Sequence, residues 1–167
     1  MRFTAQEEYG LRCLLQIARE PAGSLTIPEI AQREALTPAY VAKLMRVLRQ
    51  VGLVKSTRGQ KGGYRLACPP DQMGLGMVLA ALGGRLYSND FCGRYVGTEQ
   101  VCVHSGDCSI RPLWIALDSV VQRALSRTML TDLLRSEPAM HAWVQVHVDD
   151  AGEGSGVRGQ EKSGADP

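Results

Sequence analysis

Two helix starts in the first third of the chain restrict its fold more than any other feature. At the first, the Thr26 hydroxyl can accept the backbone N–H of Glu29, whose carboxylate can reach back. Pro28 is tolerated there because the N–H groups of a first helical turn lack intrahelical partners. At the second, Thr37 is a favourable N-cap and Pro38 a favourable first residue. The two starts predict a short helix, a brief turn and a second helix.

The second of these helices has two unlike faces. Its apolar stripe consists of Val41, Leu44, Leu48 and Val51, widened by Met45 and Val47. Lys43, Arg46 and Gln50 recur at three- and four-residue spacing and therefore share the opposite, exposed face. Ala39 and Tyr40 are expected at the N-terminal tip of the helix. The pattern predicts a helix that is buried on one side and basic on the other.

A basic, glycine-rich hairpin is expected directly after this helix. Two short extended runs, residues 53–57 and 64–67, flank the segment RGQKGG, which contains Arg58 and Lys61. Helix, turn, basic helix and hairpin in this order are typical of a winged helix-turn-helix. A helix fits the major groove of DNA, and a slender hairpin tip can approach phosphates or the minor groove.

The charge distribution supports a polyanionic partner. Residues 35–70 contain seven of the 19 Lys and Arg residues and no Asp or Glu, so the rest of the chain has 12 basic against 17 acidic residues. Positive charge is therefore concentrated where a DNA duplex would lie. The alternative is that these residues form only a solvated face. The predicted DNA contacts are Thr37, Ala39, Tyr40, Lys43 and Arg46 of the helix, and Arg58 and Lys61 of the hairpin.

The remaining patterns complete a mainly α fold with a small β wing. Apolar spacing predicts helices over residues 4–19, 73–82 and 111–127, and a short helix over 131–135. A long amphipathic helix after a small DNA-binding unit is often a dimer contact, although its stripe could instead close the core of the same chain. The predicted division is a winged helix-turn-helix DNA-binding domain over residues 1–84, a cysteine loop over 85–110, a dimerisation helix region over 111–137 and a disordered tail over 149–167.

The cysteines suggest chemistry in a reducing compartment. No signal peptide or bilayer-spanning run is evident, which favours a cytoplasmic protein with reduced thiols. Cys92, Cys102 and Cys108 fall in a glycine-containing loop, where they can converge on one site. Soft thiolates select zinc, copper(I) or iron–sulfur clusters, and the wide spacing does not favour structural zinc. The alternative is three ordinary thiols. Cys13 lies in the apolar pattern of the first helix, which predicts a core position.

These motifs together resemble the IscR/NsrR family (the Rrf-two family) of bacterial winged-helix iron–sulfur transcriptional regulators. The resemblance covers residues 1–137 and rests on MRFTAQEEYGLRCLLQIA, TPAYVAKLMRVLRQVGLV, STRGQKGGYRLA and the three-cysteine loop followed by RPLW. It implies a homodimer that binds a palindromic promoter site on double-stranded DNA, most often as a repressor. No membrane partner is implied.

For the cysteine loop, the resemblance implies a two-iron or four-iron cluster that senses redox state, nitric oxide, or iron and cluster supply. The cysteine ligand positions of the family are matched by Cys92, Cys102 and Cys108. Glu8 matches an acidic ligand that some members take from the partner subunit. Other members use a His three residues after the last Cys, where this chain has Arg111. His104, inside the loop, is a competing donor.

Two rival functions stay open beside the cluster hypothesis. A regulator with the same fold could work without metal and switch through a disulfide or a sulfenic acid. It could also respond to a protein or small-molecule partner. An enzyme is not expected, because the sequence contains no His–carboxylate–nucleophile arrangement, no phosphate loop and no CxxC pair.

Overall fold

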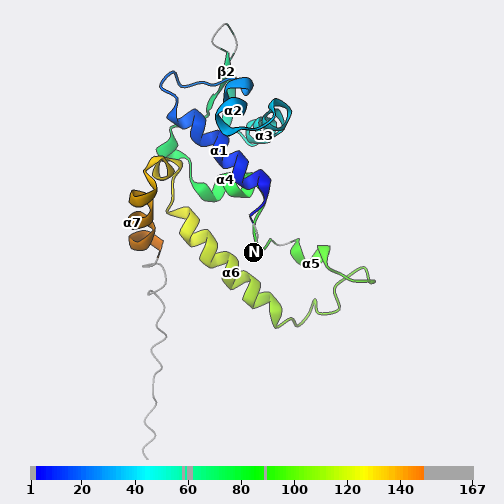
Figure 1. The fold of residues 1–167 in the computed structure, drawn as a ribbon. Helices are drawn as coiled ribbons and strands as arrows, with labels where there is room; N and C mark the ends of the chain where they lie inside the picture. The colour runs from blue at the N-terminus through cyan, green and yellow to red at the C-terminus, as the bar shows by residue number, and fades with distance from the viewer. Residues whose placement is uncertain (1–2, 58, 60–61, 89, 149–167) are drawn as a thin grey trace, which may run out of the picture.

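The computed structural model describes residues 3–57, 59, 62–88 and 90–148. Arg58 and Lys61, together with the predicted tail over residues 149–167, therefore lie outside the described residues. The predicted mainly α fold with a small β wing is confirmed (Figure 1). The elements in chain order are α1 (Ala5–Arg19), α2 (Ile27–Glu34), α3 (Pro38–Gln50), β1 (Val54–Thr57), β2 (Gly63–Leu66), the 3-10 turn η1 (Pro70–Gln72), α4 (Leu75–Leu82), α5 (Phe91–Arg94), α6 (Ile110–Ser126), the 3-10 turn η2 (Leu130–Leu134) and α7 (Glu137–Val148).

Each of the first three helices begins with a side-chain cap. The predicted box of Thr26 and Glu29 on α2 is confirmed, and Thr37 accepts a backbone N–H from the first turn of α3 at 3.3 Å. Hydrogen bonds from Thr26 lower the pKa of the Glu29 carboxyl group below its ordinary value, which keeps the acceptor charged. A second reciprocal box, formed by Thr4 and Glu7, starts α1 and was not expected from the sequence. These caps fix where the helices begin.

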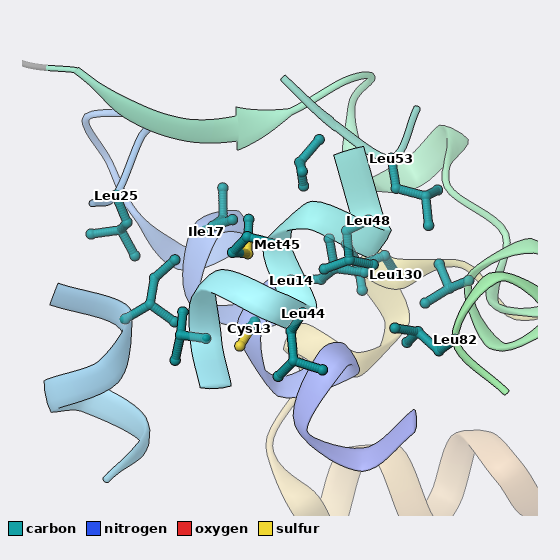
Figure 2. Close-up of a cluster of buried hydrophobic side chains, with 14 of the residues drawn as sticks. Cys13, Leu14, Ile17, Leu25, Leu44, Met45, Leu48, Leu53, Leu82 and Leu130 are labelled. Atoms are coloured by element: carbon teal, nitrogen blue, oxygen red, sulfur yellow. The ribbon is translucent and has the colours of Figure 1, made fainter. Parts of the chain in front are cut away.

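The core lies between α1, α3 and α4, where apolar faces of all three helices meet (Figure 2). Leu14 of α1 and Leu44 and Leu48 of α3 have no solvent-exposed surface. The predicted core position of Cys13 is confirmed, and burial raises the pKa of its thiol to about 12. This cysteine is therefore held as a neutral thiol inside the core.

The hairpin is tied to the segment that precedes α2. Strands β1 and β2 pair antiparallel with Lys55 opposite Arg65. Tyr64 of β2 also exchanges two backbone hydrogen bonds with Leu25, at 2.7 and 3.0 Å. Gly63 allows this approach, because a Cβ atom there would lie 2.6 Å from the carbonyl oxygen of Leu25. The stem of the hairpin and the start of α2 thus form one connected unit.

The second half departs from the sequence expectations at two helices. The helices α4 and α6 and the turn η2 lie within one or two residues of the predicted segments. The four-residue helix α5, which contains Cys92, lies inside the predicted loop. The twelve-residue helix α7 lies beyond the last predicted helix. Figure 1 shows α6 running from the helical core towards the segment that carries α5. Within the described ranges, no helix has both the length and the apolar character needed to span a bilayer.

Candidate functional site

Helix α3 presents a basic face to solvent, as the sequence predicts. Thr37, Ala39, Lys43 and Arg46 are all exposed on it. Among the described residues, neither Lys43 nor Arg46 takes part in an ion pair. Their charges therefore remain available for an external anion.

Tyr40 differs from the other predicted DNA contacts because it is half-buried. Its ring packs edge-on against Tyr9 of α1, with centroids 5.9 Å apart. The guanidinium of Arg12 lies over the other partner of this pair, 5.4 Å from the centroid of the Tyr9 ring. Arg12 in turn donates a hydrogen bond to Glu34, a buried carboxylate at the end of α2. The ring of Tyr40 thus helps to fix α3 against α1, a packing role that sequence reasoning missed.

A pair of cations on the hairpin stem was also missed. Lys55 and Arg65 lie directly opposite each other across β1 and β2, and both are exposed. Like charges at opposite positions destabilise a strand pair unless an anion screens them. Within the described ranges, neither side chain has an acidic partner within ion-pair distance. The sequence signal for this pair is its position: one basic residue in each strand at the same register of the predicted hairpin.

Two of the three loop cysteines line the same hollow. A cavity of about 590 Å³, named here the cysteine pocket, is lined by Tyr87, Cys92, Gly93, Val96, Gln100, Val101, Cys102, Ser105, Arg111 and Ile115. Cys92, Cys102 and Cys108 are half-exposed free thiols. Cys108 lies at the base of α6, where its carbonyl oxygen accepts the backbone N–H of Arg111 at 3.3 Å. Cys92 and Cys102 therefore share one pocket, and Cys108 lies beside the start of α6.

The groups around this pocket change the pKa of Tyr87. Its hydroxyl oxygen lies 3.9 Å from the Sγ atom of Cys92. Partial desolvation raises the pKa of the phenol, and the hydrogen bond to Cys92 raises it further, with a smaller contribution from the charge of Cys108. The positive charge of Arg111 acts in the opposite direction. Cys92 is thus the group that Tyr87 contacts directly.

Arg111 has a structural task in the loop. Its guanidinium donates hydrogen bonds to the carbonyl oxygens of His104 and Ser105, at 3.2 and 2.9 Å. It thereby ties the segment between Cys102 and Cys108 to the first turn of α6. This position, where the resemblance places a His ligand in other members, is used here to shape the loop.

The three loop cysteines are the type of donor that a soft metal centre needs, but in a single protomer they are not arranged around one position. Thiolates suit iron–sulfur clusters and other soft metals. Within the described residues, however, no three Cys, His, Asp or Glu side chains lie close enough together to hold a metal ion. Glu8 is exposed on α1 and belongs to no such group. Binding of a cluster would therefore require the cysteine loop to rearrange so that its three thiols converge. It would also require a donor other than these three cysteines.

The long helix α6 leaves most of its apolar stripe uncovered. Ile110, Leu113, Leu117 and Val120, which recur at three- and four-residue spacing, are each between 42% and 55% exposed. Towards its C-terminal end α6 packs Leu125 against the core of the same chain, so the chain covers that end of the helix and leaves these four residues exposed. Contiguous exposed apolar side chains of this kind are typical of a protein–protein interface.

Comparison with known proteins identifies the fold family. Residues 3–136 match the family model "Rrf2: Iron-dependent Transcriptional regulator". The chain belongs to the Rrf2 family. The protein named "Protein rrf2" of Nitratidesulfovibrio vulgaris is 33% identical over 136 residues, which cover 81% of this chain and 88% of that protein. The family match confirms a transcriptional regulator with a DNA-binding winged helix, and confirms that the chain is not an enzyme.

Solved Rrf2 structures include two differently named regulators. The IscR structure of T. potens has a TM-score of 0.63 and 27% identity, covering 85% of this chain and 90% of that one. The oxidized form of Staphylococcus aureus CymR has a TM-score of 0.61 and 28% identity, covering 81% and 98%. The two regulators match this Rrf2 chain at similar identity and TM-score. Helix α7 begins at Glu137, just beyond the family match.

Proposed function

We propose that this Rrf2 regulator is a homodimeric repressor whose affinity for a palindromic promoter site is controlled by an iron–sulfur cluster in the cysteine loop. The observation that supports it most directly is that Cys92 and Cys102 line one pocket, with Cys108 nearby at the base of α6.

In this proposal DNA is read by α3 and held by the hairpin. Thr37, Ala39 and Lys43 occupy the N-terminal half of the exposed face of α3, the part of a recognition helix that reaches base edges. Lys55 and Arg65 on the hairpin stem lie next in the chain and suit backbone phosphates. Arg58 and Lys61, which lie outside the described residues, add two basic residues between these positions in the sequence.

The cluster would be held by Cys92, Cys102 and Cys108, with Glu8 of the partner subunit as the fourth donor. A bound cluster supplies a centre that gains and loses electrons at a potential set by its surroundings. The chain's own residues hold the loop against α6, where Arg111 fixes the segment that precedes Cys108. The exposed apolar stripe of α6 is the proposed dimer contact, so a shift of the loop alters the separation of the two α3 helices. A coupling of about 1–3 kcal/mol changes DNA affinity about 5- to 150-fold.

Anaerobic purification tests the cluster directly. We expect a coloured protein with about two or about four iron atoms per protomer and matching inorganic sulfide. The Cys92→Ser variant should lose iron and colour, whereas Cys68→Ser, which replaces another half-buried thiol outside the loop, should keep both. Removal of the cluster should change affinity for promoter DNA in a gel-shift titration. A colourless, iron-free wild-type sample would reject the cluster.

A metal-free thiol switch is the second candidate. It is favoured by the absence of a formed metal site among the described residues and by similarity to the oxidized form of CymR. In that case mild oxidation of the iron-free protein should change DNA affinity, and a reductant should restore it. A regulator that responds instead to a protein or small molecule would keep its response after all three loop cysteines become Ser.

Arg46 provides the test of DNA reading. We expect Arg46→Ala to weaken binding to promoter DNA by about 1–3 kcal/mol, because the exposed guanidinium has no acidic partner among the described residues and lies on the same face of α3 as Lys43. The matched control is Arg135→Ala, which also removes one positive charge but pairs with Asp132 away from α3. Titrations on promoter and scrambled duplexes separate two roles. Equal losses on both indicate a phosphate contact, and no loss on either excludes Arg46 from the interface.

A further inference from the structure

A buried carboxylate lies in the middle of the otherwise exposed helix α6. Asp118 is 4% exposed and is the one residue of α6 that is buried. Both of its oxygens bind the first residues of the cysteine loop. The guanidinium of Arg85 forms an ion pair with one oxygen, and the backbone N–H of Tyr87 donates to the other at 3.3 Å. A charge placed so deeply is stable because both partners are present.

These two bonds determine where Tyr87 lies. From this position its hydroxyl reaches the Sγ atom of Cys92 at 3.9 Å, and its ring packs on Phe91 with centroids 5.2 Å apart. Helix α5, which carries Cys92 and Phe91, has four residues, no side-chain cap and no buried residue. A helix so short is not stable by itself. Arg94 pairs with Asp90 and Phe91 stacks on Tyr95 within this segment, whereas the contacts with Tyr87 connect Cys92 and Phe91 to the residues held on α6.

We propose that Asp118 and Tyr87 are positioning residues of the cysteine pocket: Asp118 fixes residues 85–88 against α6, and Tyr87 thereby holds Cys92 beside Cys102. This inference rests on the proposed function in treating these thiols as the sensor, whether or not a cluster is bound. It adds a path of contacts, from Cys92 through Tyr87 and Asp118 to α6. A change at Cys92 thus reaches the helix that is proposed to join the two protomers.

The test uses the full chain, reduced and free of metal, so it does not depend on cluster assembly. Alkylation of each cysteine by iodoacetamide is followed by mass spectrometry at one pH. We expect Asp118→Asn to speed alkylation of Cys92 by about three- to tenfold, because loss of the carboxylate charge weakens the bonds that hold residues 85–88. The effect is moderate because solvent already screens part of the ion pair with the half-exposed Arg85. The matched control is Asp132→Asn, another buried carboxylate with one Arg and one backbone N–H partner. It should leave Cys92 unchanged.

Two further measurements separate positioning from general destabilisation. Cys13 in the core should stay unreactive in every folded variant, because its thiol is fully buried. Arg85→Gln, at a side chain that is half exposed, should reproduce the effect of Asp118→Asn, and the double variant should be no faster than either single one. Tyr87→Phe should alter the rate at Cys92 and leave the rate at Cys68 unchanged.

The outcomes decide the inference independently of the cluster. Wild-type reactivity of Cys92 in both Asp118→Asn and Arg85→Gln would overturn it. If Cys13 becomes reactive in Asp118→Asn, that variant has unfolded. The reactivity of Cys92 in Arg85→Gln then decides the inference, and a wild-type rate there would overturn it. An iron-free wild-type sample would reject the cluster proposal while leaving this comparison of thiol reactivities intact.

Discussion

Raising the salt concentration from 50 to 200 mM should weaken binding of this protein to duplex DNA by roughly a thousandfold, as expected when six or more phosphates are neutralised. The reason is the release of counterions from DNA when cations of the protein take their place. Each protomer has Lys43, Arg46, Lys55 and Arg65 exposed on α3 and the hairpin stem, without acidic partners in the described residues. In the proposed dimer, two protomers therefore supply enough cations for an effect of this size.

The slope of the salt dependence measures how many phosphates the protein neutralises. Replacing both Lys55 and Arg65 by Gln should reduce the slope of log K against log salt by about 0.9 for each phosphate that is no longer neutralised. Arg94→Gln, which removes an exposed charge from the cysteine loop, should leave the slope unchanged. Fluorescence anisotropy at several salt concentrations measures both. A binding constant that does not vary with salt would contradict the nucleic-acid interface on α3 and the hairpin.

Leu48→Ala should destabilise the folded protein by about 2–5 kcal/mol, the range for truncation of a fully buried leucine. Leu48 has no exposed surface and lies where α3 packs on α1 (Figure 2). The loss combines the transfer of apolar atoms to water with the cavity that remains. Because the same helix presents Lys43 and Arg46, DNA affinity near the unfolding midpoint should fall with stability.

Urea unfolding followed by circular dichroism measures this difference, with wild type and variants at one protein concentration because association affects apparent stability. The matched control is Val51→Ala at the end of the same helix, where the side chain is 49% exposed. Its effect should stay within about 0.5 kcal/mol. Equal unfolding curves for Leu48→Ala and wild type would show that α3 is not anchored by this core.

Local signals were sufficient to predict the DNA-binding half of the fold. Caps at Thr26 and Thr37 and the glycine-rich hairpin are determined by residues close in sequence, and all three are found. The left-handed Ala35 between α2 and α3 could not be anticipated, since φ is +52° at a residue that is not glycine. Tyr40 was assigned to DNA alone, because its contact with Tyr9 depends on how α1 crosses α3.

The cysteine half depends on contacts that a sequence pattern does not encode. An Asp on an apolar helix is normally expected in solvent, yet Asp118 is buried because its partners approach from more than 30 residues earlier in the chain. Helix α5 contains Gly93 and is too short to show helical periodicity. Nearly all described side chains of helix α7 are exposed, so the sequence has no apolar stripe that would predict this helix. The assignments of Glu8 and the three loop cysteines as ligands stay predictions.

The backbone link between Tyr64 and Leu25 has a consequence for the promoters such a regulator can use. Because the hairpin stem is joined to the start of α2, it cannot swing independently to follow a displaced groove. One extra base pair between two half-sites rotates the second by about 35° around the duplex axis. In the proposed dimer that rotation has to be absorbed along α6 or by twisting of the DNA itself. In the proposed dimer, tolerance for different half-site spacings therefore depends on the contact between the subunits and very little on α3 and the hairpin.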